Sequence, residues 1–342
     1  MAAGSLLFAC ILTWLSWTGR AWCMGPYRAL RDEGLGKGKT PHLDLPKSLM
    51  RRWGQYAPWI PAQAYKALPE GCVVSQVNLL QRHGARYPTE GSGKLYKAAV
   101  DKLIAVDKYK AEELEFLNKF KYDMGTDDLL PFGAAHQPIG FYHASGKKIQ
   151  PSINLVIPEA MGSNTTLDDD MCPNSKLNDG DEQSDQWLNI FVPKITKRLN
   201  AAAPGANLTD HDTVSLMSMC PFHTLVSEKP SPFCFLFSED EFDDYQYYND
   251  LNKFYGNGYG APLGPVQASA TSTELLARLT NTSVHDHTQT NRTLDRTPET
   301  FPLGRPFYAD FTHDNELNSI YAALGLFPQT LLPGRVLDPR AI

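Results

Sequence analysis

A short apolar run that ends in a charged turn most constrains the fold of this chain. Val73–Leu80 is rich in β-branched and other apolar residues, which predicts a buried strand. Arg82, His83, Gly84 and Arg86 follow it directly. Ligands bind at the carboxyl ends of strands in open α/β sheets, and glycine allows a sharp, unobstructed turn. Two guanidinium groups beside an imidazole are costly to bury as core but suit an anion such as phosphate.

A second turn of the same kind lies far downstream. Pro306–Phe311 predicts another strand, and apolar residues recur at helical spacing over Leu317–Leu324. His313 and Asp314 therefore occupy a strand-to-helix turn, where free N–H groups and the helix dipole favour an anion. One turn offers a nucleophile and phosphate clamps, and the other offers a second histidine and a carboxylic acid. Together they predict phosphoryl transfer.

Each of these side chains fits a step of phosphomonoester hydrolysis. His83, when neutral, can attack phosphorus and form a phosphohistidine. Arg82 and Arg86 would lower its pKa by charge repulsion and bind the equatorial oxygens. Asp314, when protonated, can donate to the departing alkoxide and then act as base for the attacking water. His313 supplies a further hydrogen-bond donor.

The sequence between the two turns predicts helices. Residues 94–122 form an amphipathic pattern, residues 241–255 are acidic and tyrosine-rich, and residues 273–279 give a short helix signal. We therefore expect an α/β fold: an open, mostly parallel sheet flanked by helices, with a smaller, mainly helical lobe from residues 90–305. The catalytic domain is expected to span residues 53–327.

The two ends of the chain differ from this pattern. Residues 1–21 predict a signal peptide, because the apolar block Ser5–Trp17 is too short for a comfortable membrane span and Gly19–Ala21 provides a small-x-small cleavage site. A membrane anchor is the alternative. Residues 22–52 predict an irregular linker, and residues 328–342 an irregular tail.

Several features indicate an extracellular glycoprotein that binds a small molecule. The six cysteines suit an oxidising compartment. The formal charge of −6 and the lack of a long basic run argue against nucleic acid as a partner. No metal site or cofactor is expected: His285–His287 lacks further ligands, and Asp168–Asp170 predicts a solvated acidic loop without the glycine and glutamate of a calcium site. Four sequons predict N-glycosylation, at Asn164, Asn207, Asn281 and Asn291.

The run QRHGARYPT, the later FTHDN, and the pieces WGQYAPW, SMCPF, SPFC and YADF resemble the histidine acid phosphatases, branch 2 of the histidine phosphatase superfamily, and among them the secreted fungal phytases. The resemblance runs from Trp53 to Phe327 with one large interruption. It implies a secreted, monomeric hydrolase that needs no cofactor. The implied reaction releases phosphate from phytate (myo-inositol hexakisphosphate).

The same resemblance implies further roles for individual residues. Gln55, Tyr56, Thr89 and Lys253 match positions that contact inositol phosphates in the family. Alternatively, these four residues are ordinary polar residues of the surface without a role in binding.

The cysteines are interpreted through the resemblance as well. Cys220 and Cys234 match a disulfide of the fungal phytases. Cys72 and Cys172 match cysteines whose partners lie in a carboxyl-terminal stretch that this chain lacks. They are left as free thiols, or they pair with each other or with Cys23.

Two departures from the family bear on activity. Between Gly133 and Val156 the relatives carry a longer segment with another phosphate-binding arginine, followed by a helix. Here either His143 aligns with that arginine, or Ala144–Gly146 corresponds to part of the later helix. The family's last strands are missing past Phe327, so we expect a fold that is incomplete at the carboxyl terminus. Loss of one phosphate-binding arginine is expected to lower the rate of hydrolysis about 10²–10³-fold. The alternative functions are therefore a catalytically impaired homologue that still binds phosphate esters, and a general secreted acid phosphatase.

Overall fold

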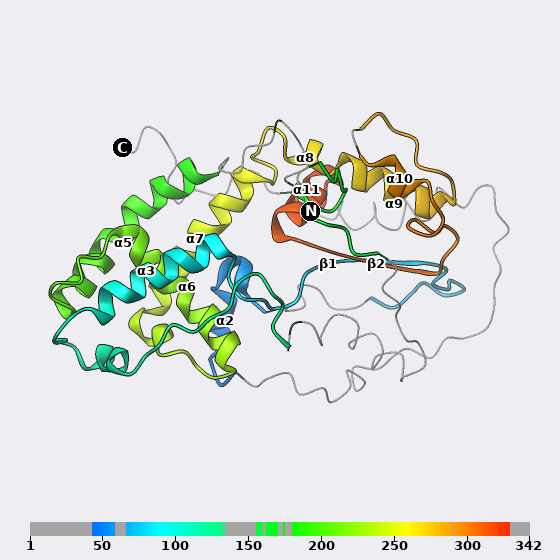
Figure 1. The fold of residues 1–342 in the computed structure, drawn as a ribbon. Helices are drawn as coiled ribbons and strands as arrows, with labels where there is room; N and C mark the ends of the chain where they lie inside the picture. The colour runs from blue at the N-terminus through cyan, green and yellow to red at the C-terminus, as the bar shows by residue number, and fades with distance from the viewer. Residues whose placement is uncertain are drawn as a thin grey trace.

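The structure is a computed structural model that describes residues 43–58, 66–131, 133, 155–159, 162–169, 174, 180–288 and 290–328 (Figure 1). Several expectations lie outside these residues: the signal peptide at 1–21, the pairing of Cys23 and Cys172, the replaced segment at 134–154, and the tail from 329 onward.

Two parallel strands connect the distant halves of the sequence. Strand β1 (Val77–Arg82) pairs with β2 (Phe307–Thr312), and Arg82 lies opposite Thr312 (Figure 1). The described residues form this two-stranded parallel sheet with helices beside it, which confirms the predicted α/β class. Because the strands are parallel, the turns that follow them leave the sheet at the same edge.

Strand β1 differs from the prediction in its position and burial. It begins at Val77, four residues later than expected, and its side chains are only partly buried. Val74 is 56% exposed and precedes the strand. An apolar β-branched run fits a fully buried strand and a half-buried one equally well, so composition did not determine the burial.

Four longer helices form a lobe to one side of the strands (Figure 1). The helices are α3 (Glu90–Ile104), α5 (Asp181–Ala202), α6 (Asp210–Ser227) and α7 (Glu239–Gly256). Side chains from all four build the main hydrophobic core of the described residues, which also encloses Trp53 and Tyr245. Capping boxes at Thr209–Asp212 and Ser238–Glu241 satisfy the first N–H groups of α6 and α7.

The long helix expected over residues 94–122 is wrong beyond Ile104. Helix α3 ends there, and Glu112–Asn118 form the 3₁₀ helix η3. Leu114 and Leu117 are 0% and 1% exposed and lie three residues apart, the spacing that places two side chains on one face of a 3₁₀ helix. An apolar residue at every third or fourth position therefore could not distinguish one long α-helix from an α-helix followed by a 3₁₀ helix.

The expected irregular linker at 22–52 is wrong over its last residues. Lys47–Arg51 form helix α2, followed by the 3₁₀ helix η2 (Gly54–Tyr56). Leu45 and Leu49 pack into the main core, so burial holds this segment against the helical lobe.

The smaller helices lie together on one side of the two strands (Figure 1). They are α8 (Gly264–Gln267), α9 (Ser269–Thr280), α10 (Arg292–Asp295) and α11 (Asp314–Ala323). Helix α11 starts immediately after β2 and contacts α7, α8 and α9, so it joins the sheet to the helical lobe. None of the helices in the described ranges is long and apolar enough to cross a membrane.

The expected disulfide is confirmed. Cys220 of α6 is bonded to Cys234 of the 3₁₀ helix η5 (Pro232–Leu236), and both residues are buried in the core. Cys72 is an exposed free thiol.

Candidate active site

Strand pairing brings the two charged turns together. The His83 N–H donates to the Thr312 carbonyl at 2.8 Å, which extends the register of the sheet by one residue. The His83 and His313 rings consequently lie 5.3 Å apart between centroids. Residues more than two hundred positions apart in the chain therefore form one cluster at the carboxyl edge of the sheet.

The ring of His83 is oriented for nucleophilic attack. Its Nδ1 lies 2.8 Å from the Gly84 carbonyl oxygen, so Nδ1 carries the proton and donates it. Nε2 then has the free lone pair and accepts from Arg86 Nε at 3.1 Å. Burial, followed by the positive charges of Arg82, Arg86 and His313, lowers the pKa of His83 to about 4, against the hydrogen bond to Gly84. The imidazole is neutral above that pH.

Gly84 is required by close packing rather than by a left-handed backbone. Its φ is not positive, but a Cβ at this position would overlap the backbone carbonyl of Gly133. A Cβ on Gly133 would in turn overlap the carbonyl of Ala85. The two backbones therefore touch, which fixes the turn that carries His83.

Both oxygens of the Asp314 carboxylate are paired with cations. Oδ1 lies 2.7 Å from Lys253 Nζ, and Oδ2 lies 3.0 Å from Arg82 Nε. Burial raises the pKa of Asp314, but Lys253 and Arg82 together outweigh burial and hold it well below its usual range. Asp314 is thus ionised in this arrangement, whereas the general-acid role requires it to carry a proton.

The residues taken from WGQY lie against Arg82. The Arg82 guanidinium donates to the backbone carbonyl of Gln55, and its Cζ lies 6.0 Å from the Tyr56 ring centroid. Gln55 therefore positions Arg82 through its main chain. Its side-chain oxygen is buried without a hydrogen-bond partner in the described part of the chain.

Thr89 has a structural role in this fold, and its expected contact with substrate stays a prediction. It is the N-cap of α3, and its hydroxyl accepts from the Ser92 N–H at 3.2 Å. Its contacts anchor the helix that follows the turn, and none of them is to the His83–Asp314 cluster.

Two residues of the cluster were missed by the sequence reasoning. Glu159 Oε1 lies 2.8 Å from His313 Nε2, and the Asn315 side-chain oxygen accepts from Lys253. Asn315 belongs to the FTHDN run and could have been found there. Glu159 follows the shortened segment and has no local signal.

A second buried acidic group lies on the far side of α11. Glu316 is 1% exposed, and its Oε1 accepts a hydrogen bond from Thr271 at 3.4 Å. Burial, then the charges of Asp169 and Asp168, raises the pKa of Glu316 to about 9. Asp169 is itself 7% exposed and accepts from Asn257, so the expected solvated loop at 168–170 is wrong at this position.

The His285–His287 run is held by contacts with neighbouring side chains. Asp286, in the middle of the His285–His287 run, is ion-paired with Arg292 and accepts from Thr273. Among the described residues no group of three or more histidine, cysteine or acidic side chains could hold a metal ion.

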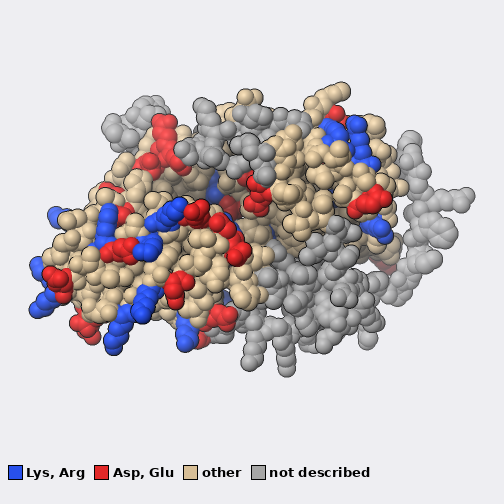
Figure 2. Space-filling model, viewed as in Figure 1, with Lys and Arg blue, Asp and Glu red and all other residues tan. Residues whose placement is uncertain are grey.

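The positive charge of the cluster is local. Figure 2 shows acidic and basic side chains interspersed over the helical lobe on the face presented there. The chain has 38 acidic and 32 basic residues, so its overall field does not attract anions. Attraction of a phosphate ester therefore depends on Arg82, Arg86 and Lys253.

Comparison with known proteins gives consistent results. The family model of the histidine phosphatase superfamily (branch 2) matches residues 73–138 and 134–338. Phytase A of Aspergillus fumigatus is 37% identical over 330 residues, covering 81% of this chain and 71% of the relative. Phytase A of Aspergillus awamori is 39% identical over 333 residues with the same coverage. The crystal structure of the phytase from D. castellii superposes with a TM-score of 0.63 at 26% identity, covering 88% of this chain and 75% of that one.

Proposed function

The chain belongs to branch 2 of the histidine phosphatase superfamily, and from this premise we propose that it hydrolyses phytate through a phosphohistidine formed on His83. The family makes it a phosphoric monoester hydrolase. One observation carries the proposed mechanism: a neutral imidazole with an available Nε2 lies among arginines, next to a carboxylate that can serve the leaving group.

The first step transfers the phosphoryl group to the protein. His83 Nε2 forms a bond to phosphorus while the bond from phosphorus to the ester oxygen breaks. Arg86 Nε, which now donates to Nε2, moves to a phosphate oxygen and leaves the lone pair free. Arg82 binds the equatorial oxygens as well, and Asp314 gives its proton to the departing alkoxide.

The second step releases phosphate. Asp314, now ionised, accepts a proton from a water molecule that attacks the phosphohistidine. The bond from nitrogen to phosphorus breaks, and His83 returns to its neutral form. In this proposal His313, whose ring lies near that of His83 and contacts Glu159, donates to one oxygen of the transferred group.

Phytate is proposed as the substrate because the relatives named above are phytases and because Gln55, Tyr56 and Lys253 border the cluster. A general acid phosphatase is the second candidate. It is favoured by the aromatic side chains Phe254, Tyr259 and Tyr321, which line a pocket next to Lys253. Aromatic walls suit an uncharged ring better than a heavily phosphorylated one.

We further propose that the protein is a secreted, monomeric glycoprotein. The buried disulfide in the helical lobe supports an oxidising compartment. Of the four sequon asparagines, Asn207 and Asn281 are exposed, while Asn164 and Asn291 are half-buried. Glycans are therefore expected first on Asn207 and Asn281.

The nucleophile assignment is tested with His83→Ala, and with His285→Ala as the matched control because His285 is exposed and outside the cluster. Phosphate release from phytate and from phenyl phosphate is measured for both variants. We expect His83→Ala to lose at least about 10³-fold in kcat and His285→Ala to match the unmodified protein. Rapid quenching with ³²P-labelled substrate should show an acid-labile, alkali-stable phosphoprotein that the His83→Ala variant lacks.

The outcomes separate the candidates. Equal activity of His83→Ala and His285→Ala would refute the mechanism. Faster release from phenyl phosphate than from phytate would favour the general phosphatase. Binding of phytate without release would identify an impaired homologue.

A further inference from the structure

The general-acid step has an obstacle in the arrangement of Asp314. Its two carboxylate oxygens contact Lys253 from α7 and Arg82 from β1. Two cations against one carboxylate favour the ionised form, and an ionised carboxylate has no proton for the departing alkoxide. Catalysis therefore requires that the substrate remove these counter-charges before the ester bond breaks.

The two cations differ in what can remove them. Arg82 ends strand β1 next to His83, where the proposed mechanism binds the phosphate to be transferred, so any phosphomonoester draws its guanidinium away from Asp314. Lys253 comes from a different element and contacts Asp314 and Asn315. A monophosphate that occupies the His83 turn leaves Lys253 where it is.

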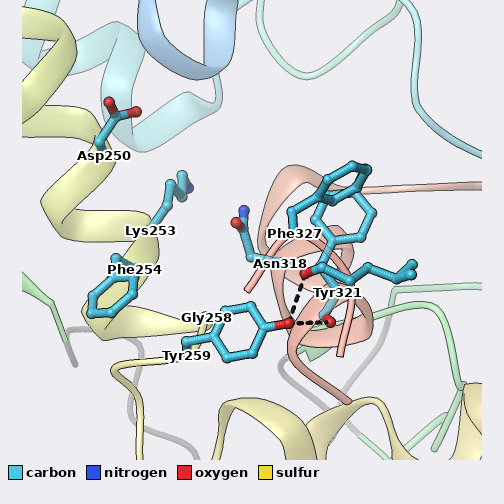
Figure 3. A pocket seen from close by; sticks show the side chains of 9 residues that line it. Asp250, Lys253, Phe254, Gly258, Tyr259, Asn318, Tyr321 and Phe327 are labelled. Atoms are coloured by element: carbon cyan, nitrogen blue, oxygen red, sulfur yellow. Dashed lines mark hydrogen bonds between the residues drawn. The ribbon is translucent and has the colours of Figure 1, made fainter. Parts of the chain in front are cut away.

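The surroundings of Lys253 leave room for it to move. Its side chain is 18% exposed and lines a pocket of about 160 Å³ between α7 and α11 (Figure 3). Asn318 faces the pocket from α11, and the Tyr259 hydroxyl closes one side by hydrogen bonding to the Tyr321 and Leu326 carbonyls (Figure 3). The ammonium group is thus next to open space and is not fixed by close packing.

We propose that Lys253 is a positioning residue that couples protonation of Asp314 to a second phosphate group on the substrate. This inference rests on the proposed function. Because Lys253 and Arg82 contact the two oxygens of one carboxylate, a small substrate with two neighbouring phosphates can reach both cations at once. The second phosphate takes the Lys253 ammonium as its counter-ion, and Asp314 is left free to bind a proton from solvent.

The other charged groups support this direction. His83 faces Asp314 from the turn after β1 and is neutral above about pH 4, so it does not replace the lost positive charge. The charge of Lys253 partly offsets the raised pKa values of Asp169 and Asp181, and Asp250 of α7, whose pKa burial raises to about 6, lines the same pocket as Lys253. The proton that Asp314 takes from solvent goes to the ester oxygen as its bond to phosphorus breaks.

The test compares two substrates that differ by one phosphate: ethylene glycol monophosphate and ethylene glycol bisphosphate. In the bisphosphate either phosphate can be transferred while the other reaches Lys253. The measurement is kcat as a function of pH, since its alkaline limb reports the acid in the enzyme–substrate complex. We expect this limb to lie at least one pH unit higher for the bisphosphate. One pH unit above the monophosphate limb, this gives about a fivefold advantage in kcat for the bisphosphate, which rises toward tenfold at higher pH.

Variants at Lys253 identify the group responsible. In Lys253→Met the two substrates should share one alkaline limb, and kcat for the monophosphate should rise above the wild-type value at pH values past the wild-type limb. Lys253→Arg keeps the charge and should retain the difference between substrates. Lys97→Met is the control for loss of a lysine, because Lys97 is exposed and pairs with Asp101 on α3. Thermal unfolding of each variant verifies that it is folded.

Coincident limbs for the two substrates in the wild-type protein, or a difference that survives in Lys253→Met, would overturn the inference. If phosphate release depends on His83 but the alkaline limbs of the two substrates coincide, the proposed function stands and only the role of Lys253 is refuted. Release that is independent of His83, or absent for both substrates, would overturn both.

Discussion

Replacing Glu316 by glutamine is expected to make the protein more stable at neutral pH and to flatten the dependence of its stability on pH. The carboxyl group is 1% exposed on α11, and its Oε2 has no hydrogen-bond partner in the described residues. Asp169 and Asp168 add negative charge beside it, so the pKa of Glu316 rises from its ordinary 4.5 to about 9. The native protein therefore holds a neutral Glu316 over most of the physiological range.

The direction of the effect follows from proton binding. Above pH 4.5 the unfolded chain releases the Glu316 proton while the folded protein retains it until about pH 9. The free energy of unfolding therefore decreases as pH rises through this window, by at most about 1.4 kcal/mol per pH unit. Between pH 5 and pH 7 this amounts to as much as about 3 kcal/mol, a large fraction of a typical domain stability.

Other carboxyl groups have to be separated from this effect. Burial raises the pKa of Glu274 to about 7, so it contributes in the same direction at lower pH. The pKa of Asp314 is lowered, so it adds stability above its ordinary 3.8, outside the window from pH 5 to pH 7. Glu274→Gln is therefore the informative second variant, and the exposed Glu115 provides the control Glu115→Gln.

The assay is urea-induced unfolding at pH 5, 6 and 7, with the free energy of unfolding obtained by linear extrapolation. The wild-type protein and Glu115→Gln should lose stability in parallel between pH 5 and pH 7. Glu316→Gln should lose markedly less and exceed the wild type at pH 7. An equally steep loss in Glu316→Gln would show that Glu316 is ionised in the native protein, and the reasoning from its burial would be refuted.

Three further changes are expected to act on stability or geometry. Replacing Cys220 and Cys234 by serine removes a bridge across 14 residues and should cost about 3 kcal/mol, measured as a lower unfolding temperature that reducing agent does not change further. Gly84→Ala places a Cβ against the Gly133 backbone, and the displaced turn should lose about 10²-fold in kcat while circular dichroism stays native. Thr209→Ala breaks the capping box of α6 and should lower the free energy of unfolding by about 1 kcal/mol with kcat unchanged.

The elements that form the site were predictable because their chemistry is local. The two strands, the arginines beside His83 and the start of α11 at Asp314 each have a signal within a few residues. Their meeting followed from a general rule about parallel strands and not from any contact visible in the sequence. The pairing of Arg82 with Thr312 supplies that contact.

The sequence could not predict the environment of residues whose neighbours are distant in the chain. Lys253 was expected from the family resemblance to contact substrate, but its position against Asp314 is set by the docking of α7 on α11. The burial of Asp169 likewise depends on Asn257, which is 88 residues away. A run of three aspartates resembles a solvated loop until the fold determines which of its carboxyl groups faces inward.

The two acids of α11 show how the fold limits the pH range of this protein. Asp314 and Glu316 are two residues apart, yet cations lower the pKa of the first, whereas burial and neighbouring acids raise that of the second. Below about pH 4, His83 becomes protonated and loses its nucleophilic lone pair. At higher pH a protonated Asp314 becomes rare, and stability falls because of Glu274 between pH 4.5 and about pH 7 and because of Glu316 between pH 4.5 and about pH 9. Activity should therefore be greatest between these limits, and a profile of kcat/KM that kept rising past pH 7 would show that the proton for the leaving group comes from another donor.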